Sequence, residues 1–222
     1  MRNFNSLNQF ELQNVFFSHE SASSGSGKWS APRSTTKINA DFFNRAADVL
    51  AKDLIGRIVE TKFNGKVTSG IITETAAYTG SKDPQSHEYK IRKNDEPVNW
   101  QSGCLYIYST QGNTMLTVAA APFIRGSTVL IRALEPLEGI DVMQERSEAD
   151  LARITIGPGN LSKALGLSVE QNGHNALARG SSIIIKPGFV ITSEQIREVK
   201  RKGDKNDAPL LRFFRNDSEW VS

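Results

Sequence analysis

The chain has 222 residues, of which 38% are hydrophobic and 23% charged, and its formal net charge is +3. This length suffices for one well-buried core and is short for two. No apolar run approaches the ~18 residues of a membrane span. A single cysteine excludes an internal disulfide framework and fits a reducing compartment. We therefore expect a protein of a reducing compartment and not a secreted one.

The first 36 residues differ from the rest. Residues 21–27 are a Ser/Gly-rich run of low complexity, and no lasting periodicity precedes them. The sequence predicts a disordered tail over residues 1–36 and one domain over residues 37–222. A cleaved targeting segment is the alternative because the tail is Ser-rich and carries Arg2 and Arg33, but Glu11 and Glu20 argue against it.

The remaining pattern mixes hairpins with isolated helices. In chain order it predicts a helix over 41–54, strands over 57–63 and 68–77 joined by an Asn-Gly turn, a polar stretch over 79–103, strands over 105–108, 115–121 and 128–134, helices over 139–146 and 160–165, and strands over 182–186 and 209–214. Asn39 or Asp41 is available to cap the first helix. This order lacks a βαβ repeat, so we expect a single α+β domain with a curved, mainly antiparallel sheet and flanking short helices.

One predicted strand carries the most chemistry. Glu74, Ala76 and Tyr78 alternate along it and should point to one face. His87 follows nine residues after Tyr78. An acid, a phenol and an imidazole so placed could bind a flat ligand that forms hydrogen bonds. The mild positive charge permits a polyanionic partner without requiring one.

Metal binding has little support in the sequence. The three histidines, His19, His87 and His174, and the one cysteine, Cys104, are scattered without ligand spacing. We expect neither a metal nor another cofactor.

Several segments resemble the alkyladenine (3-methyladenine) DNA glycosylase family of base-excision repair. The segments that carry the resemblance are residues 54–56, 74–78, 86–87, 105–108, 129–139 (Val-Leu-Ile-Arg-Ala-Leu-Glu-Pro-Leu-Glu-Gly), 157–166 (Gly-Pro-Gly-Asn-Leu-Ser-Lys-Ala-Leu-Gly), 211–214 and 218–222. The resemblance runs from about residue 40 to residue 222. It implies a monomeric protein that acts without a cofactor on damaged purines in double-stranded DNA. It also implies a place in the cytoplasm, associated with the nucleoid, if the protein is bacterial, or in the nucleus or an organelle if it is eukaryotic.

The resemblance also implies a mechanism. Such an enzyme rotates the damaged nucleotide out of the duplex and holds the base between aromatic rings, while an aromatic wedge fills the gap in the stack. A glutamate then activates a water that attacks the sugar as the N-glycosidic bond breaks.

Five residues match the family at functional positions. Tyr78 matches the aromatic residue that stacks on the base, and His87 matches the histidine that contacts the base and a phosphate. Tyr106 and Tyr108 match paired tyrosines, one of which lines the pocket. Arg132 matches the arginine that helps to hold the water and a phosphate. Without the resemblance, Tyr78 would be read as an ordinary edge tyrosine and His87 as a solvated loop residue.

Three positions depart from the family pattern. Ala76 stands where the family has its catalytic glutamate, and a methyl group cannot accept a proton. Gln111 stands at the position of the aromatic wedge. The asparagine that lines the pocket falls on Val118, or on Thr117 because the following loop is longer here.

Glu74 is the candidate to replace the missing base. It lies about 6.5–7 Å from Ala76 along the strand. Family members often carry a glutamate there as well as at the catalytic position, so a structural role for Glu74 is the alternative. Loss of a general base commonly costs ~10²–10⁴-fold in rate, which leaves excision of labile alkylated bases open.

Residues 197–215 are rich in basic side chains and could contact phosphates, although a charge run is as often a solvated surface. Lys200, Arg212 and Arg215 are the candidate phosphate contacts. Three hypotheses follow. The first is a glycosylase of alkylated or deaminated purines, its activity reduced, in which Glu74 or a positioned water replaces the usual base. The second is a protein that binds damaged DNA but hydrolyses it poorly, and the third is a glycosylase fold that has lost DNA binding and serves another ligand or partner.

Overall fold

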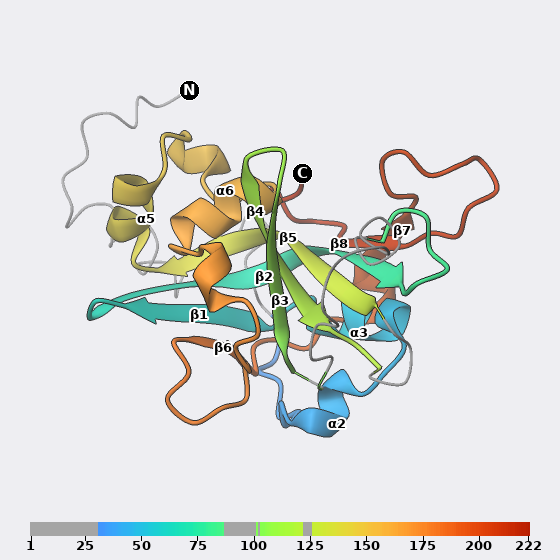
Figure 1. Cartoon of the computed structure of the whole chain (residues 1–222), viewed down its shortest axis with the longest axis horizontal. Helices are drawn as coiled ribbons and strands as arrows, with labels where there is room; N and C mark the ends of the chain where they lie inside the picture. Colours follow the sequence, from blue (N-terminus) through green and yellow to red (C-terminus); the bar gives the residue numbers. More distant parts are fainter. Residues whose placement is uncertain (1–30, 87–100, 102, 122–125) are drawn as a thin grey trace. The chain divides into compact units, whose positions relative to one another are not determined.

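The computed structural model describes residues 31–86, 101, 103–121 and 126–222. Its elements are α2 (Ala40–Phe43), α3 (Ala47–Leu54), β1 (Ile58–Phe63), β2 (Lys66–Thr79), β3 (Leu105–Thr110), β4 (Asn113–Ala119), β5 (Ser127–Glu138), α5 (Ile140–Arg146), α6 (Pro158–Ala164), β6 (Ile183–Lys186), β7 (Ile196–Val199) and β8 (Arg212–Arg215), with short 3₁₀ turns at Leu151–Arg153, Val169–Gln171 and Ser193–Gln195. Figure 1 shows these elements along the chain.

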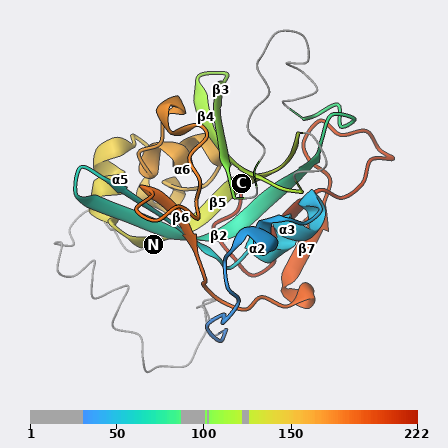
Figure 2. The same cartoon turned by 60° about the horizontal axis from the view of Figure 1, so that its bottom comes forward.

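All eight described strands belong to one antiparallel sheet. Its order is β3-β4-β5-β2-β1-β6, with β8 pairing with both β2 and β7. In Figure 1, α5 and α6 lie toward one end of β2 and β5, and α3 lies toward the other end; Figure 2 shows the same arrangement from a second direction. Residues of all four helices belong to one hydrophobic core. The prediction of an α+β domain around a curved, mainly antiparallel sheet is confirmed.

The register of the central strands separates two sets of side chains. One row across the sheet joins Ala77 of β2, Val129 of β5, Val118 of β4 and Leu105 of β3, and all four belong to the hydrophobic core. Side chains directly opposite one another in a sheet share a face, and the next residue along each strand points the other way. The face that carries this row is therefore the core face.

Helix α3 covers part of the core through three of its apolar residues. Leu50, Ala51 and Leu54 recur at helical spacing and are fully buried. The Thr75 hydroxyl of β2 donates to the Ala51 carbonyl oxygen at 2.9 Å, which ties the strand to the helix. This contact fixes β2 against the core, so the neighbouring residues of β2 are presented on the opposite face.

The predicted helix over residues 41–54 was wrong in one respect, because it is two helices. Asn39 caps the first, its side chain accepting from the Phe42 N–H at 3.0 Å. The backbone then leaves the helical conformation, and Ala46 is extended at φ −58°, ψ 143°. The Arg45 carbonyl oxygen accepts from the Ala121 N–H at 2.9 Å, so a tertiary contact takes an acceptor that a continuous helix would use internally.

Most other predicted elements are present, with shifted ends. Strand β5 continues through Pro136, which pairs with Gly70 beside a register shift, whereas the prediction stopped before this proline. Strand β7 has no counterpart in the prediction. Two residues of the predicted tail, Arg33 and Ser34, contact the domain. Arg33 forms an isolated antiparallel β-bridge with Phe189, and the Ser34 N–H donates to the Gly188 carbonyl oxygen at 2.8 Å.

Two features are absent from the described residues. None of the helices there has the length and apolar character to cross a bilayer. The same part of the chain holds no group of three or more His, Cys, Asp or Glu side chains arranged to bind a metal ion.

Candidate functional site

The candidate site lies on the face of the sheet opposite the core face, and we call it the site face. One row of this face joins Arg212 of β8, Ala76 of β2, Leu130 of β5, Thr117 of β4 and Tyr106 of β3. Tyr78, Arg132 and Tyr108 lie two residues from members of this row, so strand alternation places them on the same face. None of these eight side chains belongs to the hydrophobic core cluster.

Glu74 is at the centre of a polar network. Its side chain is 0% exposed, and its Oε1 accepts from the Nε atoms of Arg132 at 2.5 Å and Arg212 at 2.7 Å. Ser222 completes the contacts, its hydroxyl 2.9 Å from Oε1 and its backbone N–H 2.5 Å from Oε2. Four donors thus contact one buried carboxylate that can accept about four hydrogen bonds. Three of these donors contact Oε1 and one contacts Oε2, and the side chain has no exposed surface, so a water could reach the carboxylate only if a neighbouring group moved.

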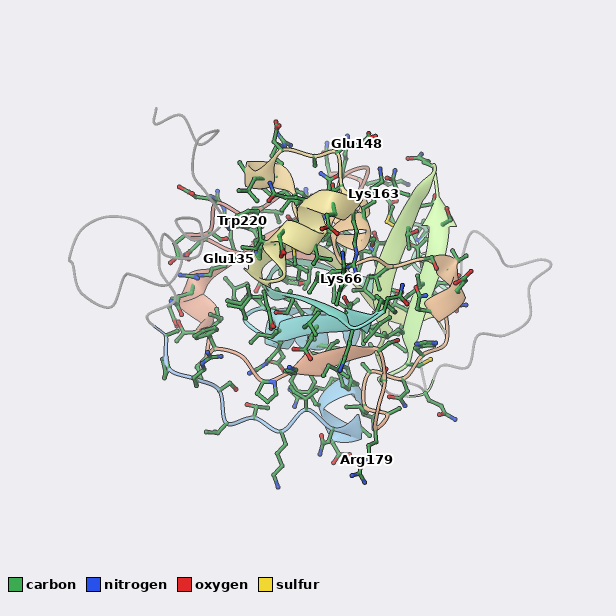
Figure 3. The ribbon with its side chains drawn as sticks, turned by 90° about the vertical axis from the view of Figure 1, so that its left-hand side faces the viewer. Lys66, Glu135, Glu148, Lys163, Arg179 and Trp220 are labelled. Atoms are coloured by element: carbon green, nitrogen blue, oxygen red, sulfur yellow. The ribbon has the colours of Figure 1, made fainter. Side chains whose placement is uncertain are left out.

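The segment after β8 supplies the rest of this network. Ser222 also accepts from Arg132 Nη2 at 2.9 Å through its hydroxyl and from Arg212 Nη2 through its carbonyl oxygen. The Thr73 hydroxyl donates to the Trp220 carbonyl oxygen at 2.6 Å. Trp220, labelled in Figure 3, is half-buried and packs against the core. Residues far apart in sequence are therefore held together around Glu74.

Ala76 occupies the middle of the site face. It is 0% exposed and lies between Leu130 on one side and Arg212 on the other. A register shift flanks Glu74, yet the contacts of Glu74 with Arg132 and Arg212 keep its carboxylate on the side of Ala76. Of the side chains named so far on this face, only that of Glu74 carries a carboxylate.

Tyr78 is half-buried near the end of β2, where Arg201 covers its ring. The Arg201 Cζ atom lies 4.8 Å from the ring centroid. Asp83 and Asp204 flank the guanidinium with contacts of 2.6–3.0 Å. Burial raises the pKa of the Tyr78 phenol above its ordinary value, although Arg201 opposes the shift, so Tyr78 is a neutral ring at physiological pH.

Tyr106 and Tyr108 form a second aromatic group. Their ring centroids are 5.0 Å apart with an interplanar angle of 28°. Burial is the main cause that raises the pKa of Tyr108, and Tyr78 and Tyr106 add to the shift. Tyr78, Tyr106 and Tyr108 thus all lie on the site face, and Tyr106 and Tyr108 are stacked on each other.

The register of β3 and β4 puts Thr117 and Val118, the two candidates for the pocket position, on different faces of the sheet. Thr117 lies opposite Tyr106 on the site face, and its hydroxyl donates to the Tyr106 carbonyl oxygen. Val118 lies opposite Leu105 and is fully buried in the core. The structure therefore places Val118 off the site face and leaves Thr117 as the candidate for the pocket position, because a one-residue step along a strand changes the face.

Gln111 lies at the tip of the β3–β4 hairpin. It is exposed, and it and Gly112 have φ angles of 50° and 74°, which are typical of a two-residue turn with both residues in the left-handed region. The Asn113 side-chain amide donates to the Gln111 carbonyl oxygen at 3.2 Å and fixes the turn. The expected wedge position is thus a protruding loop tip.

The three phosphate candidates have different surroundings. Lys200 is exposed. Arg212 is engaged by Glu74 and keeps 20% of its side chain exposed. Arg215 is 4% exposed and pairs with Asp217 at 2.5 Å, so it offers a phosphate little accessible surface. His87 lies outside the described residues.

Comparison with known proteins identifies the family. The family model described as Methylpurine-DNA glycosylase (MPG) matches residues 41–219. The chain belongs to this family. A relative from Francisella tularensis subsp. tularensis is 36% identical over 178 residues, covering 78% of this chain and 91% of its own. Relatives from Prosthecochloris aestuarii (31% identical, 84% and 91% covered) and Clostridium perfringens (30% identical, 84% and 98% covered) are also similar. All three are named "Putative 3-methyladenine DNA glycosylase".

Within this methylpurine-DNA glycosylase domain, the sequence did not single out three of the residues that build the site. Ser222 binds Glu74 through its backbone and hydroxyl, while Arg201 and Asp83 pair across 118 positions of the chain. Asp83 falls in the predicted polar stretch over residues 79–103, and Arg201 falls in the basic segment over residues 197–215. No local motif marks such long-range partners, and only the buried charge of Arg201 distinguishes it from its exposed neighbours.

Proposed function

We propose that this protein binds damaged purines extruded from duplex DNA and hydrolyses their N-glycosidic bonds slowly, chiefly those of alkylated bases that leave readily. The observation that carries this proposal is the state of the two candidate base positions. Ala76 offers a methyl group, and the Glu74 carboxylate is fully buried among four donors. Recognition elements are retained, while the base that should activate water is missing.

The contacts of Glu74 favour a structural role over catalysis. A general base must lie within hydrogen-bond reach of the proton that it removes, directly or through one water. Glu74 would first have to give up a contact to Ser222 or to an arginine. Losing such a contact leaves a buried charged group with fewer partners, which costs free energy. We therefore assign Glu74 the role of holding Arg132 and Arg212 in place.

The two arginines support a role in binding DNA. Arg132 and Arg212 share one carboxylate, and about one fifth of each side chain remains exposed. Guanidinium groups bind phosphates through paired, charge-assisted hydrogen bonds. We assign them, with Lys200, to the phosphates around the extruded nucleotide, and we assign Tyr78 and the Tyr106–Tyr108 pair to the base.

The proposed preference for labile bases follows from the leaving group. An N3- or N7-alkylated purine is cationic and departs as a neutral base, so it depends little on an activated water. Hypoxanthine is neutral and departs less readily, so it depends more on general acid–base catalysis, commonly worth ~10²–10⁴-fold. Hydrolysis without a base should thus be measurable for 7-methylguanine and negligible for hypoxanthine.

Restoring the missing carboxylate tests this proposal. Ala76→Glu is compared with Ala76→Gln, which adds the same bulk without a base, in single-turnover excision from hypoxanthine duplexes. We expect excision by Ala76→Glu to exceed that of wild type and of Ala76→Gln by about 10² or more. Efficient excision by the wild-type protein that disappears in Glu74→Gln would instead make Glu74 the catalytic base and would overturn the proposal.

A further inference from the structure

We propose that Arg201 is a positioning residue that fixes the ring of Tyr78 as the stacking surface for an extruded base. This inference rests on the function proposed above. Its starting point is the guanidinium of Arg201, whose Cζ lies 4.8 Å from the Tyr78 ring centroid. A planar guanidinium stacked on one face of a ring leaves the other face for a ligand.

The guanidinium itself has very little freedom. Its Nη1 donates to the Ala77 carbonyl oxygen at 2.8 Å and to Asp83 Oδ2 at 2.6 Å. Its Nη2 donates to Asp83 Oδ1 at 2.9 Å and Asp204 Oδ1 at 3.0 Å, and its Nε donates to Asp204 Oδ2 at 3.0 Å. All five N–H groups of the side chain therefore have acceptors. Arg201 is 8% exposed, so water competes little for these contacts.

The charges in this cluster are permanent at physiological pH. Burial alone would lower the pKa of Arg201 and raise that of Asp83, but their mutual hydrogen bonds and charges outweigh it. The pKa of Arg201 is consequently raised and that of Asp83 lowered. The contact with Tyr78 is thus not switched by ordinary changes in pH.

The same cluster holds the chain that follows Tyr78. The Asp83 carboxylate accepts from the backbone N–H groups of Thr79 at 3.1 Å and Gln85 at 3.0 Å. Tyr78 is the next-to-last residue of β2, where a strand end alone would restrain the ring weakly. Arg201 therefore contacts the Ala77 carbonyl oxygen, the Tyr78 ring and, through Asp83, the loop that follows β2. Ordering the ring before binding removes an entropic cost from base stacking.

Arg201→Lys tests the positioning role because lysine keeps the charge, lacks the planar group and has three N–H donors where arginine has five. Lys202→Met is the matched control, since Lys202 is exposed and adjacent. Affinity is measured for a 7-methylguanine duplex and for the same duplex undamaged. We expect Arg201→Lys to lower the ratio of the two affinities on the order of tenfold, the scale of one lost base–aromatic stack. Lys202→Met should leave the ratio unchanged.

A measurement without DNA separates positioning from general stability. The chain has four tyrosines, so ¹³C-labelled tyrosine NMR, assigned with Tyr78→Phe, can report the flip rate of the Tyr78 ring. We expect the ring to flip faster in Arg201→Lys than in wild type. Asp204→Asn retains the Asp83 and Ala77 contacts and should show a smaller change of the same sign, which covers the case in which Arg201→Lys does not fold.

The outcomes are distinct. A folded Arg201→Lys protein with an unchanged flip rate and an unchanged affinity ratio would overturn the positioning role. If the wild-type protein shows no preference for damaged DNA, the proposed function fails instead, and faster ring flipping in the variant would still establish that Arg201 orders Tyr78.

Discussion

Glu74→Gln is the substitution that best tests whether the Glu74 carboxylate is structural. The change removes one negative charge from a fully buried position and leaves Arg132 and Arg212 without their shared partner. It also replaces one acceptor oxygen by an amide donor. The new NH₂ group must face either a guanidinium or the Ser222 N–H, which are themselves donors, so at least one hydrogen bond is replaced by a contact between two donors.

The size of the effect can be worked out from burial. Removing one partner of a buried ion pair typically costs about 3–5 kcal/mol. Arg132 and Arg212 retain 21% and 20% exposure, so water solvates them in part and the lower end applies. We expect the free energy of unfolding to fall by about 3 kcal/mol. For a unit of this size the melting temperature should fall by about 6–12 °C.

Urea denaturation followed by circular dichroism measures this loss, and Glu60→Gln is the control. Glu60 lies on neighbouring β1 and pairs with Lys186, but the two side chains are 21% and 41% exposed. Such a pair contributes less than about 1 kcal/mol, so the control should change little. A loss below about 0.5 kcal/mol for Glu74→Gln, equal to that of the control, would show that the carboxylate is not held as described.

Three further predictions concern other parts of the chain. Gln111→Tyr places an aromatic ring at the exposed hairpin tip and should raise affinity for lesion duplexes about fivefold or more in fluorescence titrations, whereas Gln111→Ala should not. The pKa of Asp83 is lowered in the folded protein, so its carboxylate stabilises the fold at pH values above the ordinary aspartate pKa. This contribution is lost as pH falls through the folded-state pKa. The free energy of unfolding should therefore fall less steeply with pH below about pH 4 in Asp83→Asn than in wild type. Cys104 is 5% exposed and burial raises its pKa, so its labelling by a disulfide reagent should require unfolding; rapid labelling of the native protein would contradict this.

Strand alternation made part of the site predictable from sequence. It correctly placed Glu74, Ala76 and Tyr78 on one face despite the register shift beside Glu74. Alternation along one strand does not specify which residues of other strands join it. Thr117 and Val118 could be separated only by the register of the β3–β4 hairpin, which the two-residue turn at Gln111 sets.

Contacts between distant segments were beyond sequence reasoning. Arg201 resembles its basic neighbours in sequence, but the fold brings it to Asp83 and buries it. Glu74 could be read as a base or as a structural residue because its partners lie 58, 138 and 148 positions away. The break in the predicted helix likewise depends on Ala121, which binds the Arg45 carbonyl.

Binding and excision measured on one sample test the central claim most directly. Wild-type protein in excess is incubated with a hypoxanthine duplex; binding is followed by anisotropy, and abasic product by alkaline cleavage of the same sample. We predict that the lesion duplex is bound more tightly than undamaged DNA and remains essentially uncleaved. Rapid and complete excision of hypoxanthine would contradict the account, because it would require a general base that neither Ala76 nor the buried Glu74 supplies.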